Sequence, residues 1–424
     1  MTLFEIAALL IGLSALFGFI NHRYVGLPHS IGLVIIALCA SGAVLIADVA
    51  LPAAGITRAV SDGLRQIDFA DTLMNGMLSL LLFAGAVQVD LEELAQRKWA
   101  ITLMASLGVL VSTFLIGGAM WAIFNFSGLS MSFLWALVFG ALISPTDPVA
   151  VLGLLKTIRV PPLLKAKIAG ESLFNDGVGV VVFMVMVALA TGSGGEQGGT
   201  LDATEVAKLF AGEVLGGAML GMVAGYIAYA GMRRINEHNI EVMITLALVF
   251  ITYGLALRLH LSGPIAVVIS GLFIGNHGAR FAMSANTREH VFQFWELTDE
   301  ILNSVLFLLI GLEVLIVGAD LLHLPVALAA IPVALIARFI SVAIPIKLLS
   351  LREHFAQGAV RILTWGGLRG GISVALALSL PAGPAKPAIL AATYAVVVFS
   401  IIVQGLTMKH LVGRFNIAGA DKAG

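Results

Sequence analysis

The sequence predicts an all-α, polytopic membrane protein with about 13 transmembrane helices, arranged as inverted repeats with two interrupted helices that cross at mid-membrane. Composition is the first reason: of 424 residues, 59% are hydrophobic and 12% are charged, whereas soluble domains average about 25% charged residues. The second is that apolar stretches near the roughly 20 residues needed to span a bilayer recur along the chain. The third is that two of these stretches contain prolines or glycines beside charged residues.

The apolar stretches follow one another closely, so no soluble domain of any size is expected. Most are apolar on every face, as buried or lipid-facing helices are, and they lack the period-two alternation of barrel strands. The first is expected to stay as a helix, because Met1–Glu5 has no positive residue of the kind that opens a signal peptide. The stretches cover residues 3–20, 30–47, 71–89, 99–125, 132–155, 168–191, 206–230, 240–257, 263–276, 294–317, 324–348, 360–380 and 387–408.

The distribution of basic residues predicts the orientation. With the N-terminus outside and the C-terminus in the cytoplasm, most of the 24 Lys and Arg residues fall in the inner connections, as the positive-inside rule requires. The longest polar segments, residues 48–70 and Gly192–Gly199, then become flexible outer connections. The expected location is the plasma membrane, which is the inner membrane if the source is a Gram-negative bacterium. The outer connections hold only Arg58, Arg65, Lys208, Arg258 and Lys386.

Charge and cysteine content exclude several classes of protein. A net charge of −1 offers no strongly basic surface for nucleic acid. The single cysteine, Cys39, excludes an intramolecular disulfide framework and a cysteine-rich metal site. We expect Cys39 to be a small, buried apolar residue. Most of the nine histidines lie in connections, and none pairs at metal-ligand spacing, so no resident cofactor is expected.

The first predicted interruption lies in the fifth stretch, at Ser144-Pro145-Thr146-Asp147-Pro148. Two prolines three residues apart remove two backbone donors and clash with the preceding turn. Such an unwound segment survives within a membrane only where it is buried or lines a cavity. Asp147 followed by Pro148 is also typical of an N-cap and a first helical residue. The alternative is a proline kink with a satisfied aspartate.

Polar side chains enter the membrane early in the sixth stretch, within Gly170-Glu171-Ser172-Leu173-Phe174-Asn175-Asp176-Gly177. On a helix, Ser172 and Asp176 share one face, and Glu171 and Asn175 share another. The short preceding connection brings Asp176 toward Thr146 and Asp147. Carboxylate, hydroxyl and carbonyl oxygens are what a hard cation takes in place of water. The alternative is a hydrogen-bond network that only joins helices.

The second predicted interruption lies in the twelfth stretch, at Trp365-Gly366-Gly367-Leu368-Arg369-Gly370-Gly371. It comes seven stretches after the first, so the two interrupted helices run in opposite directions. Paired interruptions in inverted halves are typical of a transporter's binding site. Asp147 would offset the positive ends of the half-helices and Arg369 the negative ends. Alternatively, Arg369 snorkels to the inner surface.

Two further sets of charged residues lie within predicted spans. Arg338, deep in the eleventh stretch, needs an acidic partner, and we expect a structural pair with Glu171. The inner end of the tenth stretch is acidic and either draws cations into a funnel or is a solvated helix end. The role of the acid further out on that stretch is left open. The acids of this stretch are Glu296, Asp299, Glu300 and Glu313.

These motifs resemble the signatures of the monovalent cation:proton antiporters. Ser144 to Ala150, Gly170 to Gly177 and Trp365 to Gly370 match in order, and the resemblance covers nearly the whole chain. The match is to the electroneutral branch, with bacterial sodium/proton antiporters of the NhaP type and animal sodium/proton exchangers. Asn175-Asp176 stands where electrogenic relatives have two adjacent acids. No long tail like that of the animal exchangers follows the last stretch in this sequence, so we expect no regulation through such a tail.

The resemblance implies a homodimer and a division of each protomer into a moving core and a dimerisation domain. The cation site would be formed by Asp176, Ser172 and Thr146 with Asp147 nearby, supported by Glu171, Asn175, Arg338 and Arg369. The implied segments are a dimerisation domain (1–98 and 236–318), a core (99–191 and 319–412), a linker helix (192–235) and a short cytoplasmic tail (413–424).

The expected activity is secondary transport rather than enzyme catalysis. Asp176 would bind either a proton or a sodium ion, with lithium and potassium as alternatives to sodium, and alternating access would carry either across the membrane without net charge movement. The cell would use such exchange for pH homeostasis. Two alternatives stay open at this point: a cation channel and a sodium-coupled solute symporter.

Overall fold

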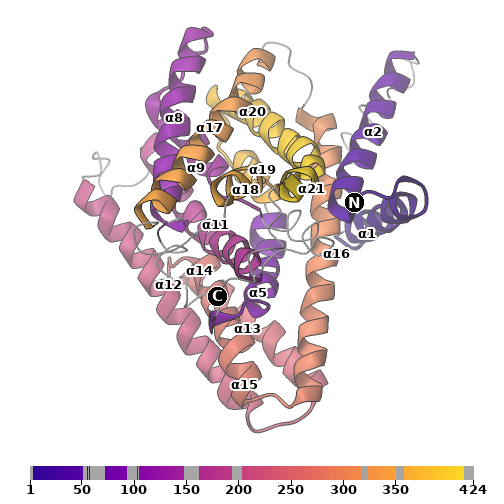
Figure 1. Cartoon of the computed structure of the whole chain (residues 1–424), viewed down its shortest axis with the longest axis vertical. Coiled ribbons are helices and arrows are strands. Elements are labelled where there is room, and N and C mark those ends of the chain that lie inside the picture. The colour runs from indigo at the N-terminus through magenta and orange to yellow at the C-terminus, as the bar shows by residue number, and fades with distance from the viewer. Residues whose placement is uncertain are drawn as a thin grey trace.

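The structure, a computed structural model, is entirely helical in the part of the chain that it describes (Figure 1). Eight of the described helices are long and apolar enough to cross a membrane. Two shorter apolar helices, Leu78–Val87 and Phe133–Ile143, accompany them. The predicted all-α membrane architecture is therefore confirmed, whereas the count of 13 helices stays a prediction. The described residues are 3–50, 55, 57, 72–92, 103, 105–147, 162–192, 203–317, 323–349 and 358–414.

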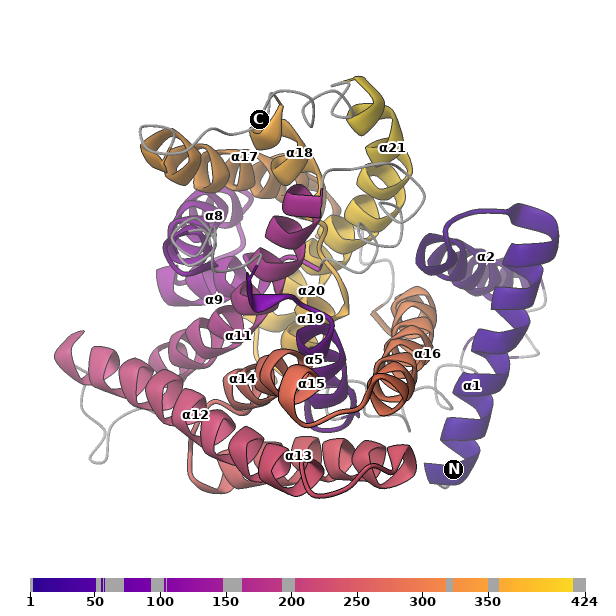
Figure 2. The ribbon, with the colours of Figure 1, turned by 60° about the horizontal axis from the view of Figure 1, so that its bottom comes forward.

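The N-terminal helices lie at one side of the molecule. Helix α1 (Leu3–Ile20) and helix α2 (His29–Ala50) are joined through the π-helical turn η1 (Asn21–Val25). Both lie beside the long helix α16 (Ala285–Val317), which separates them from most of the other helices (Figures 1 and 2). Leu33, Val34 and Ala37 are fully buried against α16.

A second group of helices packs around α14 (Gly263–Phe273). Helices α12 and α13 cross it on one side and α5 contacts it on the other (Figure 2). Their side chains form one hydrophobic cluster, to which α16 adds Trp295, and the rings of Phe83 and Trp295 lie with their centroids 4.6 Å apart. The other elements of the group are η3 (Thr72–Met77), α5 (Leu78–Val87), α12 (Ala203–Met232), α13 (His238–Arg258), η4 (Ile274–Gly278) and α15 (Ala279–Phe281).

The remaining helices form the bundle that holds the predicted interruptions. They come from two regions far apart in sequence, one before residue 192 and one after residue 323, yet α8, α9, α11, α17, α19 and α20 share one hydrophobic cluster. They are α8 (Leu107–Phe126), α9 (Phe133–Ile143), α11 (Pro162–Thr191), α17 (Leu324–Leu349), α18 (Ala359–Trp365), α19 (Gly371–Leu378), α20 (Ala385–Phe399), η5 (Ser400–Gln404) and α21 (Gly405–Arg414).

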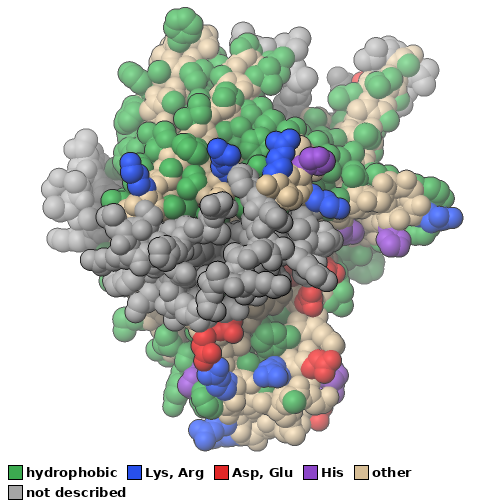
Figure 3. Space-filling view, viewed as in Figure 1, with side chains coloured by type: hydrophobic (Ala, Val, Ile, Leu, Met, Phe, Trp, Pro, Cys, Tyr) green, Lys and Arg blue, Asp and Glu red, His purple; other side chains and the backbone are tan. Residues whose placement is uncertain are grey.

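Two expectations need correction. Cys39 is exposed on α2 rather than buried, because a membrane protein turns apolar side chains toward lipid as well as toward its core. Large hydrophobic side chains are indeed exposed on many helices, and they cover the upper part of the face in Figure 3. Helix α16 begins at Ala285, earlier than residue 294, because hydropathy marks only its apolar part. Its polar first turn is helical too, capped by Ser284 Oγ, which accepts from the Thr287 amide at 3.2 Å.

Several predicted features lie outside the described residues. These include most of the connection 48–70, the loop after Gly192, the inner connection from residue 156 to residue 161 and the tail after Arg414. The second half of the fifth stretch, with Pro148 as its first helical residue, falls there as well.

Candidate functional site

The first interruption is buried where α9 ends. The helix stops at Ile143, and Ser144–Asp147 are not helical, because Pro145 has no amide hydrogen to continue the ladder. Ser144 Oγ donates to the Gly140 carbonyl at 2.7 Å and lies 3.2 Å from Thr113 Oγ1 on α8. Ser144 and Thr146 are 3% and 1% exposed, so this irregular backbone sits inside the bundle as predicted.

Helix α11 supplies the polar groups that satisfy this backbone. The Thr146 amide donates to Asn175 Oδ1 at 3.2 Å, and Asn175 Nδ2 donates to Thr146 Oγ1 at 2.8 Å. Thr146 Oγ1 also lies 3.2 Å from Ser172 Oγ. The structure thus brings Thr146, Ser172 and Asn175 together. Sequence reasoning missed the specific role of Asn175, which holds the unwound segment against α11.

Asp176 lies on the same buried face of α11. It is 6% exposed, and its electrostatic neighbours are Asp147 in the first interruption and Arg369 in the second. Ser172 is 4% exposed and lies one turn away on the same face. A carboxylate, hydroxyls and irregular backbone are therefore gathered in one buried region.

The second interruption, residues 366–370 between α18 and α19, contacts the first directly. The Asp147 amide donates to the Leu368 carbonyl at 2.8 Å. Ser373 Oγ, on the first turn of α19, donates to the Leu142 carbonyl of α9 at 2.7 Å. The two interrupted helices therefore meet at a crossing that is hydrogen-bonded through their backbones.

Arg369 bridges the two interruptions. Its Nη1 donates to the Ser144 and Pro145 carbonyls, at 2.8 Å each, so its charge lies at the negative end of half-helix α9. Arg369 is 3% exposed. The structure thus favours the predicted role at the half-helix ends over the alternative of snorkelling to the inner surface.

Asp147 faces the positive end of the other half-helix. Gly370 is the N-cap of α19, and the Asp147 carboxylate occupies the space that a Cβ atom at residue 370 would need. The carboxylate therefore sits against the helix N-terminus, where negative charge is stabilised. Close backbone approach requires glycine at this position.

Arg338 and Glu171 form the pair that the sequence predicts. Arg338 Nη1 donates to Glu171 Oε1 at 2.6 Å, and Nη2 donates to the Leu363 carbonyl at 3.3 Å. The side chains are 8% and 2% exposed. The pair joins α17 to α11, because Arg338 lies on the first of these helices and Glu171 on the second. Arg338 also packs over Gly367 of the second interruption, where a Cβ atom would lie 2.5 Å from Nε.

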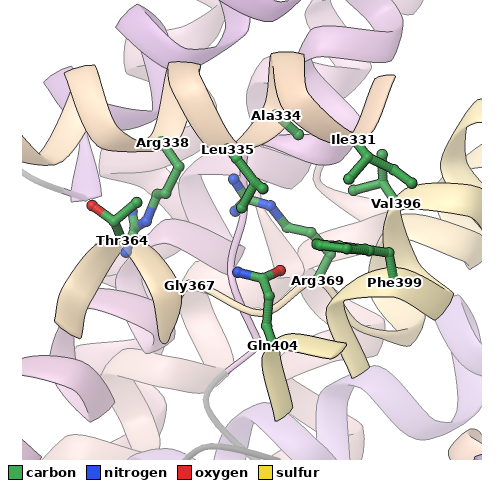
Figure 4. Close-up of a pocket in the computed structure, with 10 residues that line it drawn as sticks. All are labelled: Ile331, Ala334, Leu335, Arg338, Thr364, Gly367, Arg369, Val396, Phe399 and Gln404. Atoms are coloured by element: carbon green, nitrogen blue, oxygen red, sulfur yellow. The ribbon is translucent and has the colours of Figure 1, made fainter. Parts of the chain in front are cut away.

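A small cavity lies behind the crossing, between α17, the second interruption and the last span (Figure 4). Its volume is about 10 Å³, about the space of one water molecule. Arg338, Arg369 and Gln404 line it. Arg338 Nε has no hydrogen-bond partner among the described atoms, so a water molecule in this cavity would satisfy it.

The acids of α16 divide into two kinds. Glu296 and Glu300 are exposed and Asp299 is half-buried, accepting from Asn303 at 3.0 Å. Their exposure is compatible with both the funnel and the solvated helix end. Glu313 is 6% exposed and lies near Tyr394 of α20.

The structure also brings two histidine rings into contact, although their spacing in the sequence did not predict this. The rings of His238 and His290 lie with their centroids 4.4 Å apart, at the α13–α16 contact. No group of three or more metal-ligating residues occurs within the described ranges.

A helical bundle in which two interrupted helices cross around buried charges defines the class of secondary transporters. The chain belongs to the family of transmembrane sodium/hydrogen exchangers, whose family model matches residues 10–414. The family confirms a multi-pass membrane transporter rather than an enzyme, and it confirms the resemblance inferred from the three motifs.

Individual relatives agree with the family. The chain is 45% identical to the Na(+)/H(+) antiporter NhaP of Pseudomonas aeruginosa, over 97% of this chain and 96% of that protein. It is 33% identical to the Na(+)/H(+) antiporter NhaH of Halobacillus dabanensis, over 82% of this chain and 84% of the relative. The fold matches the sodium proton antiporter MjNhaP1 of Methanocaldococcus jannaschii, with a TM-score of 0.72, 16% identity and coverage of 97% and 98% of the two chains.

Proposed function

We propose that the protein exchanges sodium ions for protons across the plasma membrane, without net charge movement. One observation carries the proposal. Asp176 is buried beside the Thr146–Ser172–Asn175 cluster and between the charges of Asp147 and Arg369. The relatives named as Na(+)/H(+) antiporters support the same activity.

The ligands proposed for the ion are hard oxygen atoms. Asp176 provides a carboxylate, Ser172 a hydroxyl and Thr146 a backbone carbonyl, and such oxygens replace the water around a small cation. Asn175 already engages the amide and hydroxyl of Thr146, so it fixes the unwound segment rather than binding the ion. Asp147 adds negative charge nearby. Lithium or potassium would bind to the same atoms.

The mechanism rests on one carboxylate with two competing ligands. Asp176 binds either a proton or a sodium ion, and the core carries whichever is bound across the membrane by alternating access. Asn175 has no titrating group to carry a second proton. One cation moves for each proton, so the exchange is electroneutral. No cofactor takes part, because the transported ions are the only ligands that this cycle needs.

The proposed moving core comprises residues 99–191 and 319–412, and the proposed dimerisation domain comprises residues 1–98 and 236–318, with the helix of residues 192–235 between them. The shared hydrophobic cluster of α8, α9, α11, α17, α19 and α20 supports a single core body. Exposed Ile11 and Phe19 on α1 provide apolar surface for a second copy or for lipid. The proposed orientation has the N-terminus outside and residues 413–424 as a short cytoplasmic tail.

The experiment uses purified protein in liposomes that contain a pH-sensitive dye. Sodium, lithium and potassium are added in turn outside acid-loaded vesicles. The proposal expects a cation-driven rise of internal pH with saturable dependence on sodium. Ion currents far above carrier turnover would instead indicate a cation channel. Sodium uptake that occurs only with a co-transported solute would indicate a symporter.

A further inference from the structure

The last span changes from α-helix to π-helix beside the second interruption. Helix α20 ends at Phe399, the π-helical turn η5 covers Ser400–Gln404, and α21 continues from Gly405. Single π-turns within helices often occur at functional sites, because the extra residue redirects side chains. Here the turn faces the non-helical segment 366–370, and the Gln404 amide points toward the cavity next to Arg369 (Figure 4).

Two side chains of this turn bind both ends of the interruption. The Arg369 amide donates to Ser400 Oγ at 2.9 Å. Ser400 Oγ donates to Gln404 Oε1 at 2.7 Å, and Gln404 Nε2 donates to the Trp365 carbonyl at 3.0 Å. These three hydrogen bonds form a continuous chain from the start of α19 back to the end of α18.

The direction of every bond in this chain is fixed. A backbone amide only donates and a carbonyl only accepts. Ser400 must therefore accept from Arg369 and give its own hydrogen to Gln404, whose amide nitrogen then faces Trp365. Ser400 is fully buried and Gln404 is 3% exposed. Removing the Ser400 side chain takes away the acceptor of the buried Arg369 amide, and removing that of Gln404 takes away the donor to the Trp365 carbonyl at the end of α18.

The chain of bonds reaches the proposed ion site through Arg369. Its backbone is held by Ser400 on one side, while its guanidinium donates to the Ser144 and Pro145 carbonyls on the other. Asp176 is an electrostatic neighbour of the same guanidinium. A displacement of residue 369 therefore changes both the charge near Asp176 and the position of the unwound segment that contains Thr146.

We infer that Ser400 and Gln404 are positioning residues, which hold the second interruption and Arg369 in the geometry that sets cation affinity. The inference rests on the proposed sodium/proton exchange. It assigns a role to a span whose sequence, apart from these two side chains, gives no sign of participating in the site.

The test compares Ser400→Ala, Gln404→Met and the hydroxyl-retaining Ser400→Thr in liposomes. Loss of one buried hydrogen bond should raise the KM for sodium about three- to tenfold, with a maximal rate within about twofold of the wild type. Ser400→Thr should restore most of the affinity. Thr393→Val is the matched control: Thr393 is fully buried on the same span, but it bonds only the Ile389 carbonyl of its own helix, at 2.7 Å.

A second measurement separates this inference from the proposed function. Sodium and lithium should raise the melting temperature of the purified protein in detergent, and Ser400→Ala should shift the half-maximal concentration upward by the same factor as KM. If the wild-type protein in vesicles showed no sodium/proton exchange, the proposed function would be overturned. The melting assay, which measures cation binding alone, would then decide the inference. The inference itself would be overturned if Ser400→Ala and Gln404→Met both kept the wild-type KM and the wild-type half-maximal concentration. It would also be overturned if Thr393→Val changed these two quantities as much as they do.

Discussion

The Asp147 amide donates a hydrogen bond of 2.8 Å to the Leu368 carbonyl, so two interrupted helices that lie far apart in sequence are joined backbone to backbone. Both residues lie in a segment that is not helical. The second break therefore provides a hydrogen-bond acceptor for a backbone amide of the first. Substitutions at this crossing should affect transport more than they affect membrane insertion.

The substitution Asp176→Asn should abolish exchange while the protein stays folded and inserted. Asparagine keeps the volume of the side chain but neither titrates nor carries charge, so it binds neither ligand as aspartate does. Sodium-driven proton flux in liposomes, with size-exclusion profiles as the check on folding, measures this. Glu289→Gln, at an exposed position of α16, should retain wild-type flux. Wild-type rates in Asp176→Asn would refute the assignment of the carrier.

Neutralising one partner of the Arg338–Glu171 pair should destabilise the protein by about 3–5 kcal/mol, because the other is left as a buried charge without compensation. The variants Arg338→Met and Glu171→Gln, and the double variant, would be compared by melting in detergent. The double variant should recover part of the loss. Strictly additive losses would show that the 2.6 Å contact contributes no coupling.

The substitution Gly370→Ala should impair exchange and lower stability. A Cβ atom there overlaps the Asp147 carboxylate, and overpacking of this kind costs typically about 1–3 kcal/mol. Gly383→Ala is the control, since no atom lies within 4 Å of the corresponding Cβ position. Flux and melting temperature of the two variants would be measured side by side. Indistinguishable behaviour would mean that Asp147 moves aside at no cost.

Protons and sodium should compete, and membrane potential should have no effect. As pH falls, protons displace sodium from Asp176, so the KM for sodium rises while the maximal rate changes much less. At high pH no proton is carried back, so the pH profile is bell-shaped, and added sodium shifts its acidic limb to lower pH. The measurement is proton flux under potassium–valinomycin potentials at several pH values. A rate that follows the imposed potential would require a second titrating carrier, with Asp147 the first to be tested.

The parts of the site that were predictable are those with strong local signals. Pro145 removes a backbone donor and so marks the first break. A buried Arg338 requires an acid, and Glu171 was the available one. The ends of the spans and the hydrogen bonds between the two interruptions depend on tertiary packing. A local sequence pattern therefore does not predict them.

The role of the last span was not predictable for the same physical reason. Ser400 and Gln404 lie in an apolar stretch without proline or glycine at the π-turn, and their partners Trp365 and Arg369 are more than thirty residues away. The exposure of Cys39 was missed because hydropathy does not distinguish a lipid-facing position from a core one. The His238–His290 contact joins two helices whose pairing the sequence does not specify.

In the proposed mechanism, the charges at the crossing decide which loading states of the core move between the two sides of the membrane. Arg338 and Glu171 neutralise each other. Arg369 balances only one of Asp147 and Asp176, so with both acids ionised the unloaded crossing carries an excess negative charge. In the proposed cycle, one sodium ion or one proton at Asp176 would remove it. Since moving an uncompensated charge into lipid costs at least about 2.5–3.5 kcal/mol, the proposed mechanism expects an empty carrier to return slowly, which would prevent a futile leak of either gradient.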